Sequence, residues 1–542
     1  MEARGQGWFD RTIGDLVRQC RWSFLPPLMV YFAAGISALT SIVGAFFVKD
    51  YLDLSAGFLA GLSFWVGLPW VLKMPLGHLV DLIWRRKALL VYLGASLIGV
   101  SLLIMYGLVV HTQIMRDVMR IEAWYVVAAL LAPTGYVLQD VVADAMTVEA
   151  VPGVDIDGHP FPDDVSKAMH TTMQTLGRFA IISGLVAVAS INIFMFSDVE
   201  TLEQADKAQI YGRIYLFALA IPLVSVSGVV LGGLMQRVRA TRLRAEGITE
   251  DHISRLVFAP PELTEPNWQI LGGGLVFVCL SIAVGLSGVA YAEEVVFAGS
   301  LGIILFLISR LVRELPPGKA SALIGTAVII FVFRAVPLPG PGQTWFEIDV
   351  LGFDEQFLSV LSLITSCLTL AGLVVLRPLM ARRSIAYIIV ILTVAAAVLS
   401  LPNIGLYYDI QQWTSANTGG VIDARFIAVL DTAIESPLGQ VAMIPMLAWI
   451  AKNAPAHLKA TFFAVMASFT NLALSASSLA TKYLNETLVV AREVRDRQTD
   501  AIAVPADYAN LGTLLIVVAL IALIAPLVAV AVIQASRFRT ID

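Results

Sequence analysis

Acidic and basic side chains recur at helical spacing inside long apolar stretches of this sequence. Tyr136, Asp140 and Asp144 follow one another at intervals of four residues, which places both carboxylates on one face of a helix. We expect a base from the next apolar stretch, Arg178, to pair with one of these carboxylates. That stretch repeats the spacing with His170, Gln174 and Arg178.

The second half of the chain repeats this pattern. Asp431 and Glu435 stand four residues apart in one apolar stretch, and Arg334 lies at the outer end of another. Each half of the chain thus supplies acids and a base from within its apolar segments. The stretch that follows Glu435 has a polar face made of Asn471, Ser475, Ser478 and Lys482.

A charged side chain near the centre of a bilayer costs about 2.5–3.5 kcal/mol on insertion scales, so it is expected to face a partner or water. These charges could simply pair and fix the packing of the helices. Because several of them share consistent faces, a polar cavity between the helices explains the set better. Two close carboxylates resist ionising together, so either acid pair could exchange a proton near neutral pH.

The composition excludes a soluble protein. Of 542 residues, 58% are hydrophobic and 14% are charged, against roughly 45–50% and about 25% in soluble domains. The mean hydropathy is +0.80. A net charge of -5 does not favour nucleic acid as a partner, and three widely spaced cysteines support neither a disulfide framework nor a metal site. With no catalytic or cofactor motif in sight, we expect a membrane protein that is not an enzyme and uses no metal or cofactor.

About 14 apolar stretches are long enough to cross a bilayer as helices, since one crossing takes roughly 20 residues. The predicted fold class is therefore an all-α membrane protein. Lys and Arg concentrate in alternate connecting segments, which places both termini in the cytoplasm. The predicted spans are residues 27–48, 55–76, 88–110, 122–148, 169–196, 211–236, 269–291, 295–313, 320–337, 356–379, 384–402, 421–450, 460–484 and 511–535.

The predicted organisation is two six-helix bundles with two extra helices between them. A basic segment and three prolines follow the sixth span, as in two-repeat transporters. Because a helix pair returns the chain to the same side of the membrane, spans seven and eight can be inserted there, and we expect them to pack at the periphery. The expected units are an interfacial N-terminal helix in 1–26, an N-terminal bundle in 27–236, a cytoplasmic linker in 237–268, the inserted helices in 269–316 and a C-terminal bundle in 317–542.

The outer loops carry aromatic and charged side chains. We interpret the aromatic side chains of residues 337–355 and 403–420 as anchors at the membrane surface. The last outer loop, residues 485–510, mixes charges and is expected to be a solvated connector. The aromatic side chains concerned are Trp345, Phe346, Tyr407, Tyr408 and Trp413.

A turn between the second and third spans combines Gly77, Asp81, Arg85 and Arg86. The glycine would permit close approach of helices, the aspartate could accept from helix-end N–H groups or an arginine, and the basic pair would stay in the cytoplasm. An ordinary positive-inside turn would contain the same residues. The pattern resembles the loop motif of the major facilitator superfamily, which helps to lock and release the outward-facing state.

Longer segments resemble the folate-biopterin transporter family of that superfamily. The likeness covers both halves of the chain and leaves out the inserted pair. The chain departs from the family pattern at Lys459, near which the family commonly has an acidic residue. The segments are the set Lys73, Pro75, Gly77 and Asp81, then Leu138–Val151, Phe346–Leu361 and Met443–Leu484.

The resemblance implies a secondary transporter that moves a small polar or anionic solute, folate-like or pterin-like, by alternating access, with proton symport as one means of coupling. The chain is expected to be a monomer in a bacterial inner membrane. Another solute, such as a muropeptide or an amphipathic drug, is an alternative, and so is a non-transporting factor that assists the assembly of a membrane protein.

The same resemblance implies roles for the candidate residues. The solute would contact Arg178, Arg334, Lys482, Gln174, Asn471 and Tyr136. The coupling protons would bind Asp140, Asp144, Asp431 and Glu435. The gating motif would comprise Lys73, Gly77, Asp81, Arg85 and Arg86.

Overall fold

A computed structural model describes most of the chain. Within the described residues, twelve helices are long and apolar enough to cross a membrane. The expected interfacial helix falls almost entirely outside them, as do residues 376–379 of the expected span 356–379 and residues 436–450 of the expected span 421–450. The described residues are 21–52, 54–151, 162–197, 204–258, 265–287, 289–313, 315–375, 384–435, 459–495 and 502–540.

The N-terminal bundle is built from helices that closely follow the predicted apolar runs. Two of its spans are interrupted by a short 3-10 turn, and one of these turns contains Pro69, which has no N–H group for an α-helical hydrogen bond. The elements are η2 Trp22–Phe24, α2 Leu25–Ile36, η3 Ser37–Thr40, α3 Ser41–Tyr51, α4 Ala56–Gly67, η4 Leu68–Leu72, α5 Lys73–Leu82, η5 Trp84–Arg86, α6 Ala88–Val110, α7 Thr112–Val118, α8 Ile121–Ala150, α9 Asp163–Met195, α10 Gln204–Ala218 and α11 Ala220–Ala245.

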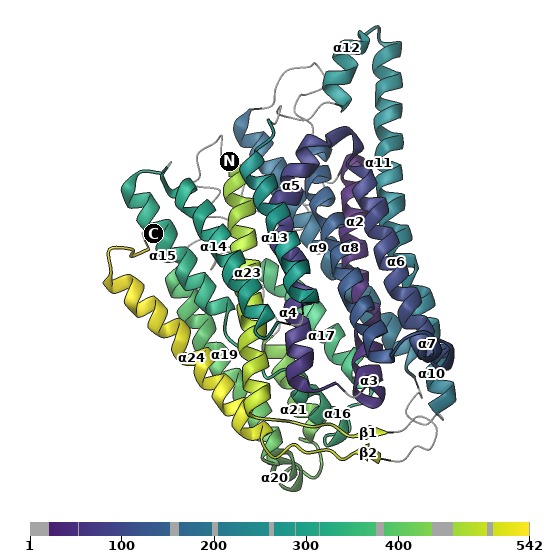
Figure 1. The fold of residues 1–542 in the computed structure, drawn as a ribbon, viewed down its shortest axis with the longest axis vertical. Coiled ribbons are helices and arrows are strands. Elements are labelled where there is room, and N and C mark those ends of the chain that lie inside the picture. The colour runs from purple at the N-terminus through teal and green to yellow at the C-terminus, as the bar shows by residue number, and fades with distance from the viewer. Residues whose placement is uncertain are drawn as a thin grey trace, which may run out of the picture.

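The linker, the inserted pair and the C-terminal helices follow. The sixth span continues as α11 to Ala245, past the predicted end at residue 236, and projects beyond the other helices together with α12 (Figure 1). The elements are α12 Glu250–Ile253, the π-helical turn η7 Ser254–Phe258, α13 Trp268–Leu286, α14 Ala292–Arg313, α15 Pro317–Arg334, α16 Pro341–Asp349, α17 Glu355–Val375, α19 Ile385–Tyr407, α20 Ile410–Asn417, α21 Ala424–Glu435, α23 Lys459–Thr487, β1 Val494–Arg495, β2 Ile502–Val504 and α24 Leu511–Ala535.

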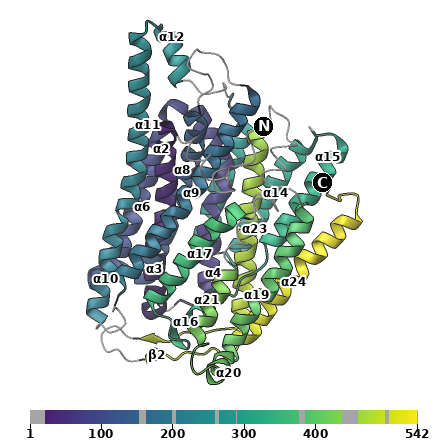
Figure 2. The ribbon, with the colours of Figure 1, turned by 180° about the vertical axis from the view of Figure 1, so that it is seen from behind.

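The two bundles meet along two pairs of helices. α9 packs against α17, and α4 packs against α23, so that helices far apart in the sequence lie side by side in both ribbon views (Figures 1 and 2). Within the N-terminal bundle, α6 and α8 approach backbone to backbone. A Cβ atom added to Gly94 would lie 2.5 Å from the carbonyl oxygen of Gly135.

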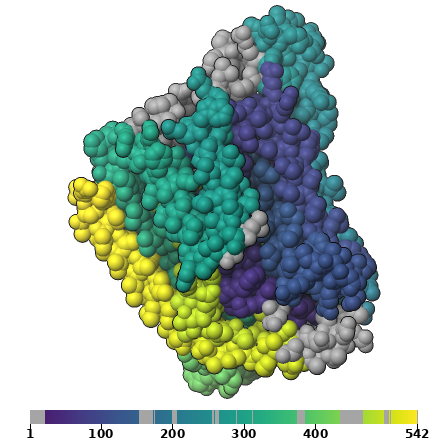
Figure 3. All heavy atoms as spheres, in the orientation of Figure 1, coloured from purple at the N-terminus to yellow at the C-terminus, as the bar shows by residue number. Residues whose placement is uncertain are grey.

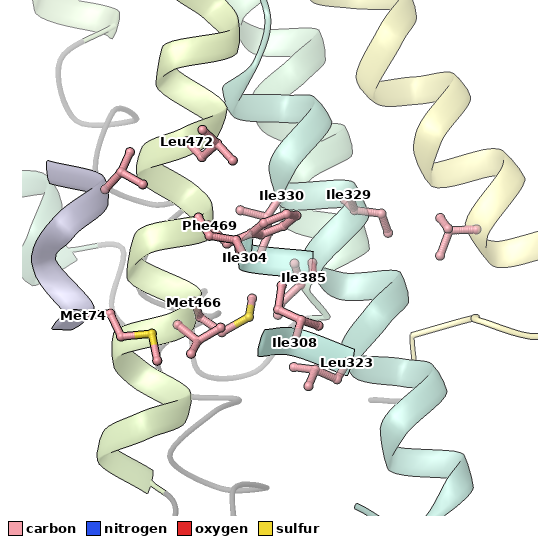
Figure 4. Close-up of a cluster of buried hydrophobic side chains, with 14 of the residues drawn as sticks. Met74, Ile304, Ile308, Leu323, Ile329, Ile330, Ile385, Met466, Phe469 and Leu472 are labelled. Atoms are coloured by element: carbon pink, nitrogen blue, oxygen red, sulfur yellow. The ribbon is translucent and has the colours of Figure 1, made fainter. Parts of the chain in front are cut away.

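The inserted helices α13 and α14 lie over the α4–α23 seam. α13 packs against α5 and α14 against α23, and Figure 3 shows this pair between the N-terminal helices and the last helix. One apolar cluster joins the pair to both bundles, because Ile304 and Ile308 of α14 pack in the same core as Phe469 of α23 and Met74 of α5 (Figure 4). The pair therefore belongs to the core between the bundles as well as to the periphery.

The outer loops are more structured than the sequence suggested. Trp345 and Phe346 are 3% and 8% exposed, so their interpretation as surface anchors is wrong, whereas Tyr408 and Trp413 are exposed. The last loop is not simply a solvated connector. It contains the antiparallel β1–β2 pair and the buried Arg492.

Candidate functional site

A lysine, two aspartates and a tyrosine form a polar cluster inside the N-terminal bundle. The Nζ atom of Lys73 lies 2.6 Å from Oδ2 of Asp140 and 2.8 Å from Oδ2 of Asp144. The hydroxyl of Tyr31 donates to Oδ1 of Asp144 at 2.5 Å. The side chains of Asp140 and Lys73 are 15% and 25% exposed, whereas that of Asp144 is 41% exposed. The cluster is thus partly buried and open to solvent at Asp144.

Four helices bring these side chains together. Lys73 is the first residue of α5, directly after the 3-10 turn η4, and the two aspartates share one face of α8. Tyr31 of α2 is positioned by α9, because a Cβ atom on Gly177 would lie 2.8 Å from the tyrosine ring. Only a glycine at residue 177 lets α9 press this close to Tyr31.

The expected pairing of Arg178 with the aspartates is wrong. Among the described residues, both carboxylates pair with Lys73, a residue that the sequence pattern placed in the gating motif. Arg178 is exposed, and its charge acts on Asp140 and Tyr31 without a direct ion pair. Arg178 is therefore a nearby cation that stays accessible.

Two further candidates of the N-terminal bundle are Tyr136 and Gln174. Tyr136 is partly buried and packs against an apolar cluster that contains Phe46 and Leu108. Gln174 belongs to α9, but its side chain lies outside the described residues.

In the second half, the candidate residues make separate contacts. Asp431 is 7% exposed and accepts from Nδ2 of Asn403 at 3.0 Å. The side chain of its expected partner Glu435 lies outside the described residues. Arg334 ends α15, and its Nε atom is buried with no hydrogen-bond acceptor among the residues that the structure describes. The Nε–H group of Arg334 could therefore donate a hydrogen bond to a bound ligand.

Two candidates on α23 are engaged in contacts between helices. Nδ2 of Asn471 donates to the carbonyl oxygen of Trp70 in η4 at 3.1 Å, across the seam between the bundles. Nζ of Lys482 lies 3.4 Å from Oε2 of Glu293, which belongs to the inserted helix α14. Both side chains hold helices together in this conformation.

The predicted gating turn is joined to α8 mainly by Lys87, the residue that follows the turn. Lys87 pairs with Glu149 at 3.1 Å and lies 3.8 Å above the ring of Trp84. Burial lowers the pKa of Lys87, and the charge of Glu149 opposes this change. The clamp between the turn and α8 is therefore made by Lys87, which the sequence reasoning overlooked.

Apart from Lys73, the residues of the motif have fewer close contacts. Nη2 of Arg85 donates to Oγ of Ser254 in the linker at 2.9 Å, and Arg86 is exposed. Asp81 lies near His78 and Lys87. A Cβ atom on Gly77 would lie 4.0 Å from Val141, an ordinary contact. The expectation that Gly77 permits a close approach of helices is therefore wrong.

At the opposite end of the molecule, several contacts tie the two bundles together. Lys49 of α3 pairs with Asp349 of α16, and Tyr211 of α10 donates to Glu355 at the start of α17. Nε of Arg492 donates to the carbonyl oxygen of Lys49 at 2.8 Å. None of these pairs follows a local sequence pattern, because their members are more than a hundred residues apart.

A partly buried glutamate lies within this closed end. Oε1 of Glu347 in α16 accepts from Nε2 of Gln343 at 2.8 Å. Burial raises the pKa of Glu347 to about 7, and the nearby charge of Asp431 adds to this effect. The closed end thus contains a group that can change its charge near neutral pH.

Comparison with known proteins agrees with this architecture. Residues 318–542 match the BT1 family. The folate-biopterin transporter of Synechocystis sp. is 23% identical over 503 residues, which cover 91% of this chain and 80% of that protein.

Solved structures show the same fold at low sequence identity. A POT family transporter in complex with 5-aminolevulinic acid superposes with a TM-score of 0.60 at 14% identity, covering 95% of this chain and 96% of that one. The nucleoside transporter NupG gives a TM-score of 0.54 at 11% identity, covering 94% and 98%. The predicted all-α membrane fold is confirmed, and the C-terminal part of the chain, residues 318–542, is similar to the BT1 family.

Proposed function

We propose that this protein is a secondary transporter that moves a small anionic solute of the folate or pterin class by alternating access, with protons as the coupling ion. The observation that carries the proposal is the cluster of Lys73, Asp140 and Asp144, which places three ionisable groups inside a membrane bundle. Because ionisable groups in the hydrocarbon core cost free energy, their presence favours a role in moving a polar solute. The names of the curated relative and of the solved structures support transport rather than an enzymatic reaction.

The anionic character of the solute is argued from two arginines. Arg178 is accessible next to the cluster, and Arg334 has a buried donor without an acceptor among the described residues. A guanidinium with free donors suits a carboxylate, which it can hold with two hydrogen bonds. Asn471 and Lys482 already bond to Trp70 and Glu293. Of the basic residues that were predicted to contact the solute, the two arginines are therefore the ones proposed to bind its carboxylate.

The conformation supports alternating access. Contacts such as Lys49–Asp349 and Tyr211–Glu355 close one end between the bundles, whereas the side chain of Asp144 is exposed in the other half of the molecule. A carrier that opens to one side at a time requires such an asymmetric state. The distribution of Lys and Arg supports placing the closed end outside and both termini in the cytoplasm.

The test is uptake of labelled folate and of a labelled pterin into vesicles that contain the purified protein, with and without an imposed proton gradient. We expect uptake that rises with the gradient and falls at least about tenfold in the Arg178→Gln and Arg334→Gln variants. Arg116→Gln, which removes an exposed charge on α7, is the matched control. Transport of a different solute, with no uptake of folate or pterin, would overturn the solute assignment.

A further inference from the structure

Among the side chains that the structure describes, the charges that act on Lys73 and Asp140 balance to zero. Ionised Asp140 and Asp144 contribute two negative charges, and Lys73 and Arg178 contribute two positive ones. Tyr31 is the titratable group that α2 adds, and the sequences of the neighbouring α4 and α6 contain no Asp, Glu, Lys or Arg. A neutral cluster is the state that a low-dielectric environment tolerates best.

In this state the charge of Lys73 is fully neutralised by the two aspartates, so it does not attract an anionic solute. Its ammonium group is shared between two carboxylates at 2.6 and 2.8 Å. An incoming anion would have to compete with both of them, and would leave the cluster with a net negative charge. The neutral cluster therefore opposes the binding of an anion alone.

The two aspartates are held differently. Asp144 accepts from Tyr31 on Oδ1 and faces Lys73 with Oδ2, so both of its oxygens are engaged as acceptors of an ionised carboxylate. Among the described contacts, Asp140 is held by Lys73 alone, through Oδ2. Protonation of Asp140 consequently costs one interaction, whereas protonation of Asp144 disturbs two.

We propose that Lys73 is the switch that links one proton to one anionic group of the solute, with Asp140 as the proton acceptor. A hydronium ion transfers a proton to a carboxylate oxygen of Asp140 and leaves as water, and the ion pair between Asp140 and Lys73 is lost. The ammonium group then keeps Asp144 and has room for an anion, and the cluster has a net charge of +1. Binding of the anion restores neutrality.

This inference rests on the proposed function and deepens it by fixing a stoichiometry. Proton and anion each bind poorly alone, because either one leaves a net charge in the bundle. Together they leave none, so each must increase the affinity of the other by the same factor. The site therefore predicts one proton for each negative charge that it binds.

The experiment measures the equilibrium affinity of the purified protein for labelled folate between about pH 6 and about pH 8. In the unaltered protein we expect the affinity to weaken about tenfold for each pH unit above the point where Asp140 ionises. The Asp140→Asn variant, which mimics the protonated acid, should bind folate with an affinity that changes little with pH. It should exchange folate across the membrane but should not accumulate it when a proton gradient is imposed. Lys73→Met should lose affinity throughout.

The matched control is Asp117→Asn, which makes the same chemical change at an exposed position on α7 and should behave like the unaltered protein. Because Lys73→Met leaves two unpaired carboxylates, its fold is checked by thermal unfolding, and the double variant Lys73→Met with Asp140→Asn provides a second test with less residual charge. Wild-type pH dependence in Asp140→Asn, or wild-type affinity in a folded Lys73 variant, would overturn the switch.

A second probe separates this inference from the solute assignment. Benzoate, a simple carboxylate, is tested for thermal stabilisation of the protein over the same pH range. If folate is neither bound nor transported but benzoate stabilises the protein in a way that depends on pH and Lys73, only the proposed solute fails. If benzoate acts equally on the Lys73→Met protein, the switch itself is wrong.

Discussion

Lys482 of α23 and Glu293 of the inserted helix α14 are joined by an ion pair of 3.4 Å. The other oxygen of the same carboxylate accepts from Nε1 of Trp65 in α4 at 3.3 Å. One side chain of the inserted pair therefore contacts both helices of the seam between the bundles. An element expected at the periphery is thus attached to the junction that the proposed alternating access would have to open.

Removing this link should destabilise the folded protein. Glu293→Gln leaves Lys482, which is 18% exposed, with only the carboxylate of Glu486 at 4.0 Å. We expect a loss of about 1–3 kcal/mol and a similar coupling energy in a double-mutant cycle with Lys482→Met. Thermal unfolding in detergent measures both. Glu486→Gln, whose side chain is 48% exposed, is the control with a smaller effect. Additive effects of the two substitutions would contradict this role of the pair.

Breaking the contact between Lys49 and Asp349 should favour opening of the molecule at that end. Asp349→Asn removes the charge that holds Lys49, whose side chain is 7% exposed. The readout is labelling of a cysteine introduced at the buried Leu54, in a protein without its native cysteines, by a reagent that does not cross membranes. We expect labelling to rise several-fold, because the closed state loses a direct contact that the open state lacks.

Exchanging the two charges at this contact tests the same idea. A Lys49→Asp, Asp349→Lys double variant should return labelling toward the original level. If each single substitution and the exchange label equally, the ion pair has no part in the closure.

The stability of the protein should depend on pH through Glu347. Burial raises the pKa of Glu347 from 4.5 to about 7, so the folded protein binds a proton there that the unfolded chain releases at lower pH. This contribution is complete below about pH 4.5 and is lost as the pH rises through about 7, with an upper limit of about 3 kcal/mol. Thermal unfolding between about pH 5 and about pH 8 measures it. Glu347→Gln should show a flatter profile, and an equally steep one would exclude Glu347 as the cause.

Two glycines of one helix provide a paired test of the helix contact. Gly94→Ala would place a Cβ atom 2.5 Å from the carbonyl oxygen of Gly135, so α6 and α8 would have to separate. We expect a loss of about 1–3 kcal/mol. Gly99→Ala meets no atom within 4 Å and should be neutral or slightly stabilising. Comparable unfolding temperatures for the two variants would show that the close approach is not rigid.

The spans were predictable because the length of an apolar run is a local property. The third predicted span, residues 88–110, coincides with α6, and the last, residues 511–535, coincides with α24. The acid pair on α8 was equally predictable, since a spacing of four residues fixes which side chains share a helical face. These features needed no knowledge of neighbouring helices.

Partners across helices were not predictable in the same way. Asp140 and Lys73 are 67 positions apart, and nothing in the sequence says whether α5 or α9 presents its base to that face of α8. Lys73 was also assigned to the gating motif, because it lies a few residues before Gly77, and so it was not considered as the partner of the aspartates. Trp345 and Phe346 were misjudged because a loop aromatic can point to the membrane surface or fold inward, and only the return of α16 against the bundles decides this.

Helices α13 and α14 shield one of the two junctions between the bundles from an apolar molecule that approaches through the bilayer. On the flank where α4 meets α23, a carboxylate, an indole and a layer of isoleucines stand between the acyl chains and the junction. The other junction, between α9 and α17, has no such cover among the residues described. Among the described residues, the two junctions between the bundles are therefore unequal in what separates them from lipid.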